Sequence, residues 1–229
     1  NNSAMTVVIS EVMRNYYANL FPGNNYYIAR NAAHKQNIKK EISRLKNNSS
    51  FTISYTGNLE LGRWKILAYL AKALKNLNEK NKSCKVLLNI YSQIRPSDKI
   101  IKNITNEYSK YLGNVSGIKL NDVRLNSDIL LFVESFNPRY KEILESALST
   151  KIPEYLSYGR NILAIAPPYS WSLQYLHNNN AAYCIKNVNE IGPELEKYLK
   201  KLDQGELQSL IDNGLRIFLE KHEFNSNAE

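Results

Sequence analysis

Three short and almost unbroken apolar runs restrict the fold of this 229-residue chain more than any other feature. They are DILLFV (128–133), ILAIA (162–166) and AAYCI (181–185). A strand with one face in water alternates apolar and polar residues, whereas a strand covered on both faces is apolar throughout. The runs therefore predict a mainly parallel sheet with helices on both of its faces.

Helical patterns separate the strand-like runs that come earlier in the chain. FTISYTG (51–57) ends in glycine, and KVLLNIY (85–91) follows after an amphipathic segment. In that segment four leucines repeat at helical spacing, namely Leu67, Leu70, Leu74 and Leu77. Residues 205–220 carry enough apolar side chains for a closing helix. Because strands and helices alternate, we expect right-handed crossovers and a doubly wound, Rossmann-like α/β domain.

One connection does not fit this regular alternation. The link between GNVSGIK (113–119) and DILLFV consists of residues 120–127, which is scarcely long enough for the helix of a regular crossover. Either one pair of strands is antiparallel at this point, or the chain lacks some residues. The sequence leaves both explanations open.

The start of the chain predicts a further, separate α/β unit. Strand TVVIS (6–10) is followed by helix EVMRNYYANLF (11–21), the breaker PGNN and strand YYIAR (26–30). A polar helical stretch at about residues 34–46 separates this unit from the rest and suggests a hinge. We therefore divide the chain into residues 1–45, a partial α/β unit with its hinge, and residues 46–229, the main domain.

Basic side chains outnumber acidic ones, 30 to 21, and give a formal net charge of +9. This charge favours an anionic partner, which is a phosphorylated ligand, a nucleic acid or an anionic membrane face. No apolar run approaches the roughly 20 residues of a membrane-spanning helix, and the polar start has no hydrophobic signal core. We expect a soluble, cytoplasmic protein.

The three histidines do not form a metal-binding pattern. His34, His177 and His222 are scattered, and they lack the i, i+4 and HExxH spacings of metal ligands. The sequence shows no acidic metal cluster either. We therefore expect no metal and no cofactor.

The segment GNLELGRW (57–64) follows the first predicted strand of the sheet, where ligands of open α/β sheets bind. Its two glycines have the spacing of a P-loop, but Arg63 and Trp64 stand where a P-loop needs lysine and a hydroxyl residue. Gly57 still permits a close approach of the backbone, and Arg63 begins a helix, where anions are favoured. The alternative is a glycine turn with a solvent-facing arginine.

The segment STKIPEYLSYG (149–159) predicts a very short helix. Ser149 or Thr150 can cap its start, and Pro153 fits the first turn. Gly159 can end the helix in the left-handed conformation, which leaves about two turns.

Two charged residues of this helix are candidates for binding. The exposed amides of its first turn and the Lys151 side chain would point toward the strand ends and meet an anion there. Glu154 is not needed for capping, so its carboxylate can accept hydrogen bonds from a neutral polyol. The alternative is a first-turn glutamate that the helix dipole favours.

Three segments together resemble the carboxyl-terminal domain of the GT-B fold glycosyltransferases, nearest to the large family 4 of retaining sugar transferases. They are TISYTGNLELGRWK (52–65), DILLFVES (128–135) and STKIPEYLSYGRNILAIAPP (149–168). The resemblance extends from about residue 50 to the end. Residues 7–31 also look like the last unit of that family's amino-terminal, acceptor-binding domain. The resemblance implies that residues 1–45 are a remnant of that domain and that the chain is a fragment.

The resemblance also implies roles for the glycine turn and the short helix. The glycine that lets the donor's diphosphate approach matches Gly57, and the basic residue that pairs with the diphosphate matches Arg63. Asn58 stands where the family often has an additional arginine. The amides after Ser149 and Thr150, together with the side chain of Lys151, would add positive charge. Positive groups that meet the departing diphosphate lower the barrier to bond cleavage.

Family members commonly carry two glutamates eight positions apart, of which the second binds the nucleotide ribose. Glu154 matches this second glutamate, so the resemblance implies that Arg63 and Glu154 are the central catalytic residues. The first glutamate would fall at Ser146, which departs from the pattern. Glu134 or Glu145 could replace it, and the sequence does not decide between them.

The function implied is transfer of a sugar from a nucleoside diphosphate to a saccharide or lipid-linked acceptor, in the synthesis of a bacterial surface polysaccharide. The +9 charge would suit peripheral contact with an anionic membrane that carries such an acceptor. A second domain would hold the acceptor across a cleft. We therefore expect the isolated chain to bind nucleotide but to turn over poorly.

Two other functions remain open. A nucleotide-sugar epimerase of the same fold would need acid and base groups in the cleft, and no carboxylate or histidine pair stands out. A non-enzymatic basic module could bind nucleic acid, but no basic stripe with interleaved aromatic residues is present. We expect no nucleic acid partner.

Overall fold

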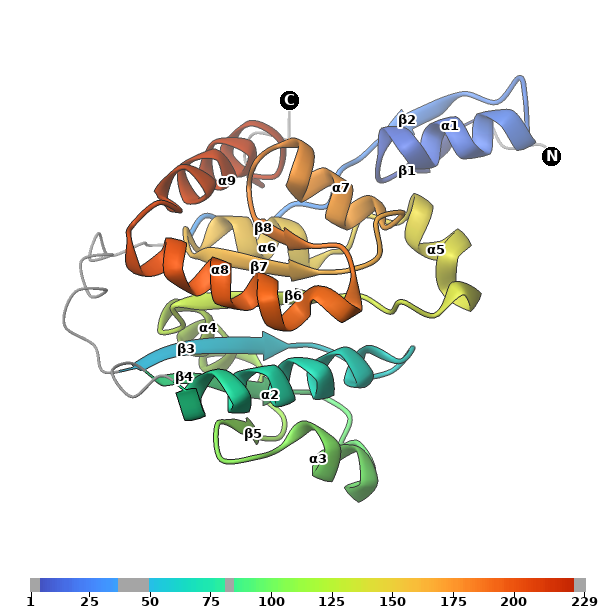
Figure 1. Cartoon of the computed structure of the whole chain (residues 1–229). Helices are drawn as coiled ribbons and strands as arrows, with labels where there is room; N and C mark the ends of the chain where they lie inside the picture. The colour runs from blue at the N-terminus through green and yellow to red at the C-terminus, as the bar shows by residue number, and fades with distance from the viewer. Residues whose placement is uncertain (1–4, 37–49, 81–84, 225–229) are drawn as a thin grey trace.

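The computed structural model describes residues 5–36, 50–80 and 85–224 of the chain (Figure 1). Its main part is a six-stranded sheet with the strand order β5-β4-β3-β6-β7-β8, in which every paired strand is parallel. The strands are β3 (Ser50–Thr56), β4 (Lys85–Tyr91), β5 (Ser109–Tyr111), β6 (Ile129–Val133), β7 (Asn161–Ile165) and β8 (Tyr183–Ile185). This order and direction confirm the predicted doubly wound, Rossmann-like α/β domain.

The side chains of the central strands pack into two separate hydrophobic cores, one on each face of the sheet. In β6, Ile129, Leu131 and Val133 belong to one core, whereas Leu130 and Phe132 belong to the other. This alternation is what two-sided burial of a strand requires. The continuous apolar runs are therefore explained by helices that cover both faces (Figure 1).

Different helices complete the two cores. The first core contains side chains of α2 (Arg63–Lys80), α3 (Asp98–Ile104) and α8 (Ile191–Asp203). The second contains side chains of α6 (Lys151–Ser157), α7 (Trp171–Asn178) and α9 (Gln208–Lys221), with Leu125 of α4 (Gly117–Leu125) packed against it. The predicted closing helix is thus confirmed as α9. The described helices include none with the length and apolar character needed to cross a bilayer.

The structure supports neither of the two explanations that the sequence suggested for the irregular crossover. Residues 113–119 do not form a strand, because β5 ends at Tyr111 and Gly113 has a positive φ of 82°. Helix α4 instead begins at Gly117, so the segment read as a link is most of the helix. Both β5 and β6 pair in parallel with their neighbours. The antiparallel reading was wrong, and the connection is a short but complete crossover.

The predicted amino-terminal unit is present as a small two-stranded parallel sheet. It consists of β1 (Thr6–Val8), α1 (Glu11–Leu20) and β2 (Tyr26–Ile28). Ser10 caps α1, because its hydroxyl accepts a hydrogen bond from the Met13 amide at 3.1 Å. Residues 34–36 are not helical, and the rest of the predicted polar helix and hinge lies outside the described residues. The domain boundary at residue 45 therefore stays a prediction.

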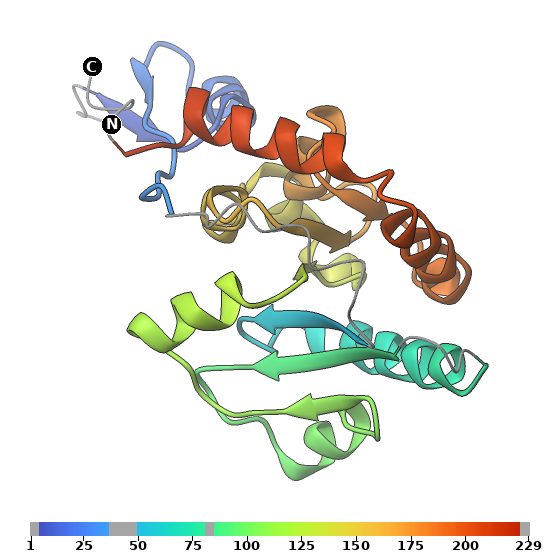
Figure 2. The same ribbon diagram turned by 90° about the vertical axis from the view of Figure 1, so that its left-hand side faces the viewer.

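The end of α9 joins this unit to the main domain. Figure 2 shows α9 running toward the amino-terminal unit. The amide of Ala33 donates to the carbonyl of His222, and the amide of Phe224 donates to the carbonyl of Ala33. The buried His222 ring bonds on both sides, from Nδ1 to the carbonyl of Asn31 and from Nε2 to the hydroxyl of Tyr175, at 2.8 Å each.

These partners define the neutral form of the His222 ring. Since a carbonyl only accepts, Nδ1 carries the proton and Nε2 accepts from Tyr175. Burial lowers the pKa of His222, the hydrogen bond to Asn31 opposes this change, and the charges of Arg30 and Lys221 reinforce it. The nearby Glu11 acts in the opposite direction.

We predict that this junction weakens in mild acid. The unfolded chain takes up the His222 proton near pH 6.5, and the folded chain takes it up only at lower pH. The stabilising contribution is therefore complete above about pH 6.5 and is lost as the pH falls below it. Urea unfolding of the wild type and His222→Gln between pH 5 and 8 should show a smaller pH slope in the variant. His177→Gln, at an exposed histidine, is the control, and an unchanged slope in His222→Gln would contradict the prediction.

Candidate functional site

A cavity of about 350 Å³ lies beyond the carboxyl ends of β3 and β4. The last residues of these strands and the loops that follow them, residues 56–58 and 91–94, line one side of it, together with Val115. Helix α4 contributes Leu120 and Arg124, and the start of α6 contributes Thr150, Lys151 and Glu154. Because strand order reverses between β3 and β6, the cavity lies at the switch point where open α/β sheets bind ligands.

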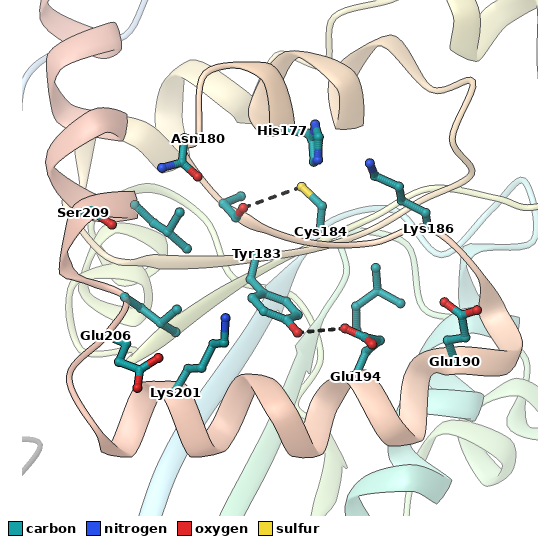
Figure 3. A pocket seen from close by; sticks show the side chains of 14 residues that line it. His177, Asn180, Tyr183, Cys184, Lys186, Glu190, Glu194, Lys201, Glu206 and Ser209 are labelled. Atoms are coloured by element: carbon teal, nitrogen blue, oxygen red, sulfur yellow. Dashed lines mark hydrogen bonds between the residues drawn. The ribbon is translucent and has the colours of Figure 1, made fainter.

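A second cavity, of about 500 Å³, lies along the edge strand β8 (Figure 3). Its charged side chains have both signs, and the hydroxyl of Tyr183 donates to Glu194 at 2.8 Å. No residue that the sequence identified for donor binding lines this cavity. The cavity at the strand ends is therefore the better candidate for the functional site.

Lys151 brings a positive charge to the cavity at the strand ends. Its ammonium lies 5.1 Å from the ring centre of Tyr55 and fills the space above Gly57. A Cβ atom on residue 57 would lie 2.0 Å from Nζ and 2.8 Å from Cε of Lys151. Gly57 is thus required for the position of Lys151. The implied approach of a diphosphate to this glycine remains a prediction.

The surroundings of Lys151 weaken its hold on its proton. Burial lowers the pKa of Lys151 to about 8, and the charges of Arg63 and Arg124 act in the same direction. The carboxylates of Glu134 and Glu154 oppose the change. A partly buried ammonium surrounded by two arginines and two carboxylates leaves an excess of positive charge, so an added anion would be favourable here.

Arg63 does not line the cavity in this structure. It forms an ion pair with Glu134, with 2.9 Å from Nε and 2.7 Å from Nη2 to the same oxygen, Oε2. Both side chains are mostly buried. Glu134, a candidate to replace the missing first glutamate, is thus the partner of Arg63. The structure does not bring Arg63 and Glu154 together in one cavity, although Arg63 acts on Lys151 through its charge.

Glu154 lines the cavity and has a partner that sequence reasoning missed. Its Oε2 lies 2.9 Å from Nη2 of Arg124, a residue of α4. The side chain of Glu154 is 44% exposed, whereas that of Arg124 is only 8% exposed. Arg124 lies in the segment that was read as too short for a helix. The helical position of Arg124 was therefore not foreseen, and no other signal in the sequence indicated it.

The short helix has the predicted limits but only weak capping. Helix α6 has seven residues with Pro153 in its first turn, and Gly159 follows in the left-handed conformation with φ of 57°. Thr150 makes no side-chain cap, and the hydroxyl of Ser149 accepts from the Lys151 amide at a long 3.4 Å. The amide of Ser149 donates to the hydroxyl of Ser172, which anchors the loop.

The remaining candidates have structural partners. Asn58 closes the turn after β3, since its side chain accepts from the Glu60 amide at 2.7 Å and donates to the Glu60 carboxylate at 2.8 Å. The hydroxyl of Ser146 donates at 3.4 Å to the carbonyl of Glu142, and Glu145 forms an exposed ion pair with Lys141. Neither Ser146 nor Glu145 lines the cavity.

Comparison with solved structures shows the fold of GT-B glycosyltransferases. A glycosyltransferase from Rickettsia africae matches with a TM-score of 0.70 and 14% identity over 96% of this chain. Sucrose-phosphate synthase from Thermosynechococcus elongatus matches with 0.70 and 13% over 99%. Anabaena Alr3699/HepE, in complex with UDP and glucose, matches with 0.67 and 13% over 98%. No protein-family model and no curated protein sequence matches the chain.

The chain spans little more than half of these solved structures. It covers 60% of the Rickettsia protein, 56% of the synthase and 61% of the Anabaena protein. The likeness confirms the expected GT-B architecture. At this level of identity it does not extend to the substrate of any one neighbour.

The partial burial of Lys151 leads to a prediction about stability. Because the folded pKa of Lys151, about 8, lies below the ordinary lysine pKa of 10.5, the charged side chain destabilises the fold at neutral pH. We expect Lys151→Met to increase the free energy of unfolding at pH 7 by about 1 to 3 kcal/mol, and this gain should shrink as the pH rises from 8 to 10.5. Urea unfolding at several pH values tests this expectation. Lys72→Met, at an exposed lysine, is the control, and a variant less stable than wild type at pH 7 would contradict it.

Proposed function

We propose that the chain is the donor-binding part of a glycosyltransferase, which holds a nucleoside-diphosphate sugar at the cavity beyond β3 and β4. The observation that carries the proposal is the arrangement of two side chains. A partly buried ammonium, Lys151, lies above a glycine, and a partly exposed carboxylate, Glu154, lines the same cavity from the next turn of α6. This pair offers one group to a diphosphate and the other to the hydroxyls of a sugar.

The charges of the site suit cleavage of the bond between sugar and diphosphate. As this bond breaks, negative charge grows on the departing phosphate, and a fixed cation in a site of low dielectric constant lowers the barrier. Lys151 is such a cation, and a bound diphosphate would in turn favour its charged form. We propose that Arg63 joins it when the ion pair with Glu134 opens. No metal or cofactor is part of this proposal.

The cavity also has a place for the nucleoside. Its volume of about 350 Å³ is within the range of small-molecule sites. Ile94, Val115 and Leu120 provide apolar surface on the side of α4 and the loop after β4. These groups suit the flat face of a base. The UDP in the complex of the Anabaena neighbour supports a uridine nucleotide as the first ligand to test.

The rest of the reaction is proposed on the same basis. The sugar would pass, with retention of its configuration, to a saccharide or lipid-linked acceptor held by a second domain, in the synthesis of a bacterial surface polysaccharide. The partial unit β1–α1–β2 would belong to that second domain. The net charge of +9 supports work on the cytoplasmic side, near an anionic membrane.

Calorimetry with UDP and GDP tests the proposed ligand class and its base preference together. We expect the wild-type chain to bind one of them, and Glu154→Ala and Arg63→Ala to weaken binding by about 1.5 to 3 kcal/mol each, as charge-assisted hydrogen bonds do. Circular dichroism should first show that the variants are folded. Arg139→Ala, at an exposed position, should bind as wild type does. A wild-type chain that binds neither nucleotide would refute the proposal.

The pH dependence of binding should identify the role of Lys151. Above about pH 8 the free protein loses the Lys151 proton, so a diphosphate must bind together with a proton. We expect affinity to fall by up to about tenfold per pH unit above that point. Lys151→Met should bind weakly with no such fall. A wild-type affinity that stays constant from pH 7 to 10 would show that the ammonium does not contact the ligand.

A further inference from the structure

Arg124 is a buried charged residue to which the proposed sugar transfer assigns no role. Its Nη2 lies 2.9 Å from the Glu154 carboxylate, and its Nε donates to the hydroxyl of Thr56 at 3.2 Å. The guanidinium carbon lies 5.4 Å from the ring centre of Tyr155 and 5.7 Å from that of Tyr158. A planar group held by two rings, one hydrogen bond and one ion pair has little freedom to move.

The two members of the ion pair differ in their access to the cavity. Arg124 is 8% exposed and Glu154 is 44% exposed, so the arginine lies behind and the carboxylate lies in front. Among the described residues, the ion pair engages Oε2 of Glu154, and Oε1 has no hydrogen bond to protein. An immobile cation beside one oxygen favours one rotation of the carboxylate. The other oxygen is then presented to a ligand in one orientation.

The pair also settles an electrostatic conflict in the cavity. A lone carboxylate next to a diphosphate would repel it, and the repulsion is strong where water is excluded. The charge of Arg124 offsets that of Glu154. The carboxylate can therefore serve as an acceptor for hydroxyl groups without weakening the attraction of Lys151 for the phosphates.

We propose that Arg124 is a positioning residue that orients the Glu154 carboxylate to accept hydrogen bonds from the ribose hydroxyls, and so makes the cavity select ribonucleoside diphosphates. This inference rests on the proposed donor site. Arg124 itself touches no ligand atom in this scheme. It acts through Glu154. Arg124 belongs to α4, which is a separate element from the glycine turn after β3 and from the short helix α6.

A merely structural role would have different consequences. The Arg124 side chain packs against two tyrosines of the α6 region, so its loss could loosen α4 from α6. Such loosening, or the loss of positive charge, would weaken the binding of every nucleotide to the same extent. The positioning role instead predicts a change in the ratio of the affinities for two ligands that differ only in the ribose hydroxyls.

The test uses calorimetry of the whole chain with UDP and its 2′,3′-dideoxy analogue, or the guanosine pair if GDP binds more tightly. The wild type should prefer the ribonucleotide by roughly tenfold or more, from one or more hydrogen bonds to a charged group. Arg124→Met should reduce this ratio to near one, as Glu154→Ala does. Arg124→Lys should restore part of the ratio and serves as the second variant if Arg124→Met fails to fold. Arg139→Met, at an exposed arginine, should keep the wild-type ratio.

The outcomes separate this inference from the proposed function. A wild type that binds neither UDP nor GDP overturns both. A wild type that binds UDP and the dideoxy analogue equally overturns ribose selection alone. A folded Arg124→Met or Arg124→Lys variant that binds both ligands less tightly, with the wild-type ratio preserved, reduces Arg124 to a structural residue. A collapsed ratio in Arg124→Met, with partial recovery in Arg124→Lys, supports the positioning role.

Discussion

Two-sided burial of the central strands determines where polar chemistry can occur in this molecule. Every residue of β6 and of β7 is buried, and neighbouring residues pack into opposite cores. Such strands leave no room for a functional side chain along their length, because each face is already filled by helices. Charged groups must therefore lie beyond the strand ends. Glu134 directly follows β6, and the start of α6 brings Lys151 and Glu154 to the same edge.

At that edge, buried and partly buried charges of alternating sign form a chain. Glu134 pairs with Arg63, Lys151 lies under the influence of both, and Glu154 pairs with Arg124 on the other side. The set has three cations and two anions, and Lys151 has no ion-pair partner within it. Buried ion pairs contribute little net stability, but they fix geometry. The excess positive charge destabilises the free protein and attracts an anion, which is the trade-off between stability and function that binding sites commonly show.

The sequence was sufficient for features that depend on local pattern. The apolar runs identified β6, β7 and β8, and the segment 149–159 identified a short helix between a weak cap and Gly159. The sequence was insufficient where the role of a side chain depended on a helix or strand that the sequence pattern did not reveal. Helix α4 is polar and only nine residues long, so its apolar periodicity was too weak to detect. Arg124 was missed with it. The partner of Arg63 was missed because residues 63 and 134 are far apart in the chain and meet only through the pairing of β3 with β6.

Helix α9 connects the site to the amino-terminal unit through close packing. Gly214 of α9 lies so near α6 that a Cβ atom would be 3.1 Å from Cδ2 of Leu156, and Leu156 is buried two residues after Glu154. His222 directly follows the end of α9, and its ring bonds to Asn31 of the segment that leaves β2. The same helix therefore fixes the position of α6, which carries Lys151 and Glu154, and of the unit β1–α1–β2. Since a packed helix resists bending, the distance between this unit and the cavity is set by α9 and not by the covalent connection alone.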